Sequence, residues 1–175
     1  NVSLMASIVA HLGEAAAESW AKGVVRNFAR TPQSNDTGQI RAVASGECQI
    51  AVVNTYYLAR LAASNDPADL AVAAAVGIVF PGQQGNGTHV NISGAGVVST
   101  SPNRDNAILF LEYLTSDRAQ SLFADGNNEY PAVSRVGASS NVAALGDFKE
   151  DGLNAAELGV HQSTAIMVFD RAGWQ

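Results

Sequence analysis

The feature that most constrains the fold is a short apolar run that ends in polar residues, within Gln49–Arg60. The run, Ile50–Val53, is unbroken and rich in β-branched residues, and it is too short for a helix. Such a run is typical of a strand buried on both faces, as in a parallel sheet. Because ligands of open α/β sheets bind beyond the carboxyl ends of strands, Asn54, Thr55, Tyr56 and Tyr57 lie where a ligand is expected.

The two tyrosines are adjacent in the sequence, and this limits how they can share a ligand. Successive side chains point about 180° apart in a strand and about 100° apart in a helix. If Tyr56 and Tyr57 act on one ligand, we therefore expect the backbone to turn there. Taken alone, such a pair is more typical of packing, with the rings buried and the hydroxyls at the solvent.

Composition excludes several classes of protein. The chain has 175 residues, of which 47% are hydrophobic and 15% charged, and this predicts a folded core. Its formal net charge of −6 argues against nucleic acid or an anionic membrane as a partner. The single cysteine, Cys48, excludes an internal disulfide and a cysteine-based zinc site. No stretch approaches the roughly 20 apolar residues of a membrane span, so no membrane insertion is expected.

Local patterns predict the remaining elements. Asp36 and Gln39 have the spacing of a capping box at the start of a helix. Apolar periodicity and caps predict helices over 3–12, 14–29, 38–44, 58–63 and 161–172, and others that start at Ser101 and Ser116, while Asn154 with Glu157 is expected to cap a short turn. Alternating or β-branched runs predict strands over 76–79, 88–93 and 95–98.

The segment 53–61, Val-Asn-Thr-Tyr-Tyr-Leu-Ala-Arg-Leu, resembles the paired-tyrosine segment of bacterial ferric-iron-binding proteins. These proteins are the solute-binding components of iron ABC transporters. The resemblance extends to Asn35–Arg41, Gly94–Val98, Asn127–Pro131 and Asp170–Trp174. Because these segments lie in the same order over nearly the whole chain, a metal-binding role for the tyrosines is favoured over packing alone.

The resemblance implies an α/β fold of the periplasmic-binding-protein type (type II), represented mostly by its second lobe. Residues 1–175 would be the C-terminal portion of a two-lobe solute-binding protein, with a third tyrosine just ahead of Asn1. Residues 80–98 would be a hinge that crosses to the first lobe and back. The implied location is periplasmic, although residues 1–175 contain no signal peptide.

The implied function is capture of ferric iron, Fe(3+), through Tyr56 and Tyr57 and delivery to the permease of an ABC importer. Phenolate oxygen is a hard anionic donor, which suits this hard cation. Family members complete the coordination with an anion such as carbonate or phosphate. Asn54 and Asn35 are candidate hydrogen-bond donors, either to that anion or to the side chains that ligate the metal.

Two alternatives remain open. One is a binding protein of the same fold for another solute, an anion or a polyamine, in which the tyrosines stack or donate hydrogen bonds. The other is a hydrolase whose serine and histidine meet only in three dimensions. His11, His89 and His161 lie in separate segments, without a Gly-x-Ser-x-Gly or His-Glu-x-x-His motif. An enzyme is therefore not predicted.

Overall fold

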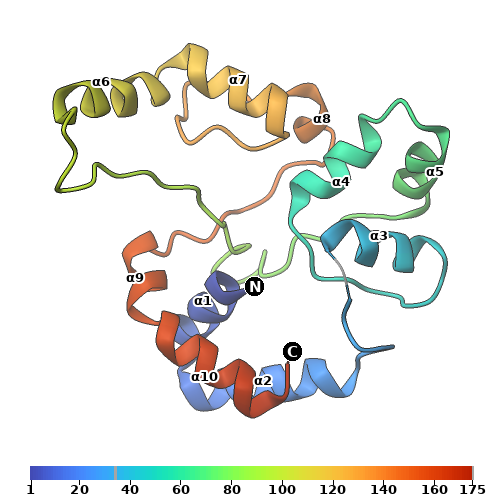
Figure 1. The fold of residues 1–175 in the computed structure, drawn as a ribbon. Helices are drawn as coiled ribbons and strands as arrows, with labels where there is room; N and C mark the ends of the chain where they lie inside the picture. The colour runs from blue at the N-terminus through green and yellow to red at the C-terminus, as the bar shows by residue number, and fades with distance from the viewer. Residues whose placement is uncertain (34, 175) are drawn as a thin grey trace. The chain divides into compact units, whose positions relative to one another are not determined.

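The structure is a computed structural model that describes residues 1–33 and 35–174. In these ranges the regular secondary structure consists of ten α-helices, α1 to α10 in chain order (Figure 1). The contacts within the chain divide it into two compact units. Unit 1 comprises Asn1–Gln33, Val79–Ile92 and Phe148–Gln175, and unit 2 comprises Ser34–Ile78 and Ser93–Asp147.

Unit 1 is built around four helices. They are α1 (Val2–Leu12), α2 (Glu14–Arg26), α9 (Ala155–Val160) and α10 (Gln162–Ala172). Helix α1 contacts each of the other three. The buried core is made largely of small residues, which let the helix backbones approach closely: Met5, Ala6, Val9, Ala17, Ala21, Ala165 and Val168. At the end of α1, Leu12 is 61% exposed and lies outside this core.

An aromatic cluster closes one end of unit 1. The ring centroid of Trp174 lies 5.9 Å from that of Trp20, 5.5 Å from that of Phe28 and 5.1 Å from that of Phe169. Gly173, with φ 71°, ends α10 in the left-handed conformation that glycine adopts readily, and so turns Trp174 toward α2. The cluster therefore joins α2 to the end of α10.

Unit 2 contains the other six helices. They are α3 (Asp36–Ala44), α4 (Thr55–Ala62), α5 (Pro67–Ala75), α6 (Arg104–Leu114), α7 (Asp117–Asn127) and α8 (Ser140–Ala143). Helix α4 packs against α3, α5 and α8, while α6 packs against α7. The buried side chains of this unit include Ile40, Ala59, Leu61, Ala124 and Val142. Helix α4, which carries the tyrosine pair, is therefore held from three sides.

The predicted strands are absent from the described residues. The one β-type contact recorded there is an isolated parallel bridge between Thr88 and Glu150. Ile50 is 82% exposed, Val79 86% and Val98 68%, so the predicted strand segments are not buried. A strand needs a hydrogen-bonded neighbour, and β-branched composition alone does not supply one. The described residues are helix-rich, and the strands predicted over 50–53, 76–79, 88–93 and 95–98 are wrong.

The N-terminal ends of the helices agree with the sequence in some cases and differ from it in others. Ser116 caps α7 as predicted, because its hydroxyl accepts a 3.3 Å hydrogen bond from the amide of Ala119. The start at Ser101 is wrong, since α6 begins at Arg104. The cap of α3 is Asn35, whose side-chain oxygen accepts a 3.1 Å bond from the amide of Gly38. This contact takes the place of the Asp36 cap expected from the sequence.

Candidate functional site

The two tyrosines lie side by side in the first turn of α4. Tyr56 and Tyr57 are both half-buried, and their ring centroids are 4.3 Å apart with an interplanar angle of 33°. The backbone changes direction just before the pair, because Asn54 is extended and α4 begins at Thr55. Consecutive Cβ atoms diverge on a helix, but a tyrosine has two rotatable side-chain bonds and its ring can lean toward the neighbouring ring.

The phenol groups interact directly. A hydrogen bond to Tyr57 is the largest cause that raises the pKa of Tyr56 to about 12. Burial and the neighbouring charges of Tyr57 and Asp36 raise this pKa further, whereas the charge of Arg60 lowers it. The phenol of Tyr56 is thus protonated at neutral pH when no cation is present. A bound metal ion must displace phenol protons before it can use the oxygens.

Arg60 lies one turn after the tyrosines and faces both rings. Its guanidinium carbon is 5.8 Å from the ring centroid of Tyr56 and 5.7 Å from that of Tyr57. These distances are in the range of cation–π interactions. Sequence reasoning missed this residue, although its position three and four residues after the pair places it on the same side of a helix.

The two predicted anion donors are engaged within unit 2. The backbone amide and the side-chain amide of Asn54 donate to Oδ2 of Asp36, over 2.8 Å and 3.1 Å. Asn35 caps α3 through its side-chain oxygen. Both asparagines therefore stabilise the two helix starts next to the tyrosines. A role for either in anion binding stays a prediction.

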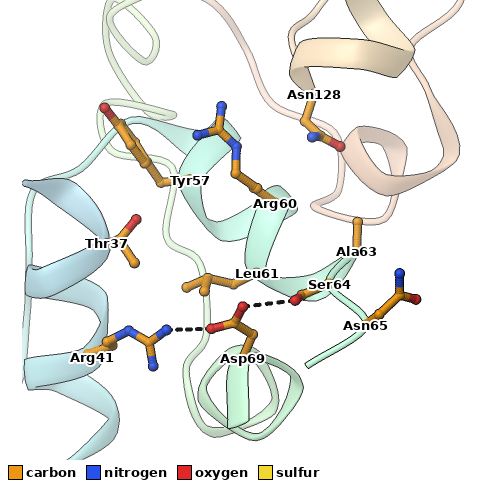
Figure 2. A pocket seen from close by; sticks show the side chains of 10 residues that line it. All are labelled: Thr37, Arg41, Tyr57, Arg60, Leu61, Ala63, Ser64, Asn65, Asp69 and Asn128. Atoms are coloured by element: carbon orange, nitrogen blue, oxygen red, sulfur yellow. Dashed lines mark hydrogen bonds and ion pairs between the residues drawn. The ribbon is translucent and has the colours of Figure 1, made fainter. Parts of the chain in front are cut away.

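A pocket of ≈ 490 Å³ opens beside Tyr57, entirely within unit 2 (Figure 2). Its lining comprises Thr37, Arg41, Tyr57, Arg60, Leu61, Ala63, Ser64, Asn65, Asp69 and Asn128. Figure 2 shows Arg41 of α3 and Asp69 of α5 pointing toward each other, and they form an ion pair. The Ser64 hydroxyl donates a 2.8 Å bond to the same carboxylate. The guanidinium groups of Arg41 and Arg60 and the phenol of Tyr57 thus line the same pocket.

The histidines of unit 1 are engaged in polar contacts of that unit. His11 Nε2 lies 2.9 Å from a carboxylate oxygen of Asp151, and the Ser7 hydroxyl donates to the same oxygen over 3.1 Å. His89 Nε2 lies 3.3 Å from the Ser3 hydroxyl. Within residues 1–33 and 35–174, no group of three or more His, Cys, Asp or Glu side chains is placed to hold a metal ion. The tyrosine pair therefore remains the candidate metal site.

None of the helices in the described part of the chain is long and apolar enough to cross a membrane. Residues 1–151 match bacterial extracellular solute-binding proteins. The chain belongs to this family. Because it is a family of binding proteins without enzymatic activity, the prediction that the chain is not an enzyme is confirmed.

Two curated relatives of this solute-binding protein come from Synechocystis sp. Iron uptake protein A1 is 49% identical over 175 residues, which cover 100% of this chain and 49% of the relative. Iron uptake protein A2 is 50% identical over 177 residues, with 100% of this chain and 51% of the relative covered. The chain thus spans about half the length of these relatives.

Solved structures agree with these relatives. Trichodesmium IdiA (FutA), in complex with iron and citrate ligands, is 53% identical with a TM-score of 0.95, over 100% of this chain and 55% of that one. The ferric binding protein from Campylobacter jejuni is 38% identical with a TM-score of 0.94, over 99% of this chain and 55% of that one. The resemblance to ferric-iron-binding proteins and their type II periplasmic-binding-protein fold is confirmed. The lobe assignment and the hinge at 80–98 stay predictions.

Proposed function

We propose that the protein carrying this chain binds ferric iron outside the cytoplasmic membrane through Tyr56 and Tyr57, and delivers it to the permease of an ABC importer. The observation that carries the proposal is the convergence of the two phenols, 4.3 Å apart between ring centroids, at the start of one helix. The two Synechocystis relatives are iron uptake proteins, and this chain matches about half of the length of each. A periplasmic location agrees with the extracellular solute-binding family.

The donor chemistry fits ferric iron better than softer metals. Two phenolates supply hard anionic oxygens, whereas the described residues hold no cluster of cysteine and histidine ligands. Two negative charges on adjacent oxygens repel each other, and a trivalent cation between them removes that repulsion. Further ligands must come from outside this pair, because ferric iron is commonly six-coordinate.

An anion is a suitable source of those further ligands. Arg60 is exposed and faces both phenol rings, so it can hold a negatively charged group beside the metal. The similar Trichodesmium protein was solved with iron and citrate. We propose that this chain likewise accepts iron together with a small oxyanion or carboxylate, with carbonate, phosphate and citrate as the compounds to test.

The decisive experiment is addition of ferric citrate to the intact protein. We expect a visible tyrosinate-to-iron charge-transfer band, weakened in Tyr56→Phe and in Tyr57→Phe and absent from the double variant. Tyr113→Phe is the matched control, since this tyrosine is on α6 and does not line the pocket. A protein that stays colourless while binding iron would contradict ligation by the tyrosines.

Capture of an anionic solute without iron is the second candidate, and it is favoured by the two arginines, Arg41 and Arg60, that line the pocket. Arg41 is already paired with Asp69, which leaves less of its charge for a ligand. Calorimetry with citrate or phosphate in the absence of iron separates the two candidates. Tight binding of either anion without iron, lost in Arg60→Gln, would favour anion capture.

A further inference from the structure

Helix α4 begins at a contact with a neighbouring helix. Asp36, the first residue of α3, receives two hydrogen bonds on Oδ2, from the backbone amide and the side-chain amide of Asn54. Asn54 is the residue that immediately precedes α4. Asp36 and Asn54 are both half-buried, so the contact is partly shielded from water. Two residues that are 18 positions apart in the sequence are thus joined at the helix start that carries the tyrosines.

This contact takes the place of an ordinary helix cap. An asparagine before a helix usually accepts a hydrogen bond from the second or third amide of that helix. The side chain of Asn54 makes no such bond, and its amide group donates to Asp36 instead. The cap of α3 is supplied by Asn35, which leaves the carboxylate of Asp36 available for α4. The orientation of the first turn of α4 is therefore set from α3.

We propose that Asp36 is a positioning residue for the tyrosine pair: by holding Asn54, it sets the direction in which Tyr56 and Tyr57 leave the first turn of α4. This inference rests on the proposed function. Asp36 does not have to touch the metal, because Asn54 is two residues before Tyr56. A charged acceptor is suited to this role, since hydrogen bonds to a carboxylate are stronger than those between neutral groups.

The test compares three variants of the intact protein: Asp36→Ala, Asp36→Asn, and Asp36→Asn combined with Asn54→Asp. Ferric affinity is measured by competition with citrate, together with the charge-transfer band and the unfolding temperature. Groups that orient metal ligands typically contribute roughly 10- to 100-fold to affinity, and we expect a loss of this size for Asp36→Ala. Asp105→Ala, an exposed carboxylate in the first turn of α6, is the matched control and should not change affinity.

The exchanged pair distinguishes positioning from charge. With the two side chains swapped, the amide group at position 36 can donate a hydrogen bond to the carboxylate at position 54. The amide oxygen at position 36 can still accept a hydrogen bond from the backbone amide of residue 54. We expect the exchange to restore most of the affinity that Asp36→Ala loses. Unchanged affinity in Asp36→Ala would overturn the inference. So would an exchanged pair that unfolds at the wild-type temperature but stays as weak as Asp36→Ala.

Failure of the proposed function has a different signature. If the wild-type protein shows no charge-transfer band, iron binding through the tyrosines is wrong. The positioning of the rings is then measured without metal, from the NMR cross-peaks between the two tyrosine rings. Loss of these cross-peaks in Asp36→Ala, with the control variant unchanged, supports the role of Asp36 in orienting the pair. Cross-peaks that persist in Asp36→Ala overturn it.

Discussion

The rings of Tyr56 and Tyr57 lie with their centroids 4.3 Å apart, although the two residues are consecutive in α4. Their phenols share a hydrogen bond, which raises the pKa of Tyr56 to about 12. The same proximity that would let both oxygens reach one cation therefore makes the proton of Tyr56 harder to remove. A cation that binds here competes directly with protons.

The first prediction concerns the pH dependence of iron binding. The raised pKa of Tyr56 means that its phenol is protonated throughout the neutral range, so binding must release that proton. With both phenols ligating, release of roughly two protons makes affinity rise by roughly a hundredfold for each pH unit. Calorimetry in two buffers of different ionisation enthalpy counts the protons directly.

The control for this prediction is Tyr56→Phe, in which one phenol is absent. The number of released protons should fall from roughly two to roughly one. Tyr113→Phe, on α6, should leave the number unchanged. Affinity that is equal at neutral and mildly acidic pH, with the anion held constant, would argue against phenolate ligation.

The second prediction concerns acid unfolding of unit 1. Burial raises the pKa of Asp151, but hydrogen bonds from His11, the amide of Leu153 and Ser7 outweigh it, and the pKa lies below its usual value. A lowered pKa in the folded state stabilises the protein above the usual pKa near 4, and this contribution is lost as the pH falls through the lowered value. The chain should therefore lose stability below about pH 4.

Asp151→Asn tests this contribution. Because the carboxylate is largely buried and accepts several hydrogen bonds, its loss should lower the free energy of unfolding by about 2 kcal/mol at pH 6. The difference from wild type should shrink as the pH falls through the lowered pKa of Asp151, where the wild-type carboxyl also becomes neutral. Urea unfolding at several pH values measures both effects, with the exposed Asp125→Asn as control. A difference that does not vary with pH would contradict the assignment.

The third prediction compares two isoleucines of unit 2. Ile40 is 4% exposed on α3, whereas Ile50 is 82% exposed in the segment predicted to be a strand. Ile40→Ala should lower the free energy of unfolding by about 2–5 kcal/mol, because it leaves a cavity. Ile50→Ala should change it by less than about 0.5 kcal/mol, as expected for an exposed position. Urea unfolding of both variants measures these changes. A large loss of stability in Ile50→Ala would show that the segment is buried.

Local signals in the sequence predicted most of the helices, but α5 (Pro67–Ala75) and α8 (Ser140–Ala143) were missed. Gly13, with φ 80°, separates α1 from α2, and Ser116 caps α7, both as expected. Each backbone hydrogen bond of a helix joins residues four positions apart, so the information lies within one short segment. The position of the tyrosine pair and the family resemblance were likewise readable from the order of residues.

Contacts between distant segments were decided by the tertiary structure. The segment 50–53 has the composition of a strand, but strand hydrogen bonds require a neighbour, and the described residues contain no strand. Asp36 has the spacing of a cap for its own helix. Its carboxylate instead accepts two hydrogen bonds from Asn54, which is 18 residues away in the sequence. The sequence by itself thus determined most of the helices and the position of the tyrosine pair. Only packing in three dimensions decided that Asp36 contacts Asn54 beside that pair, because such contacts depend on how α3 and α4 meet.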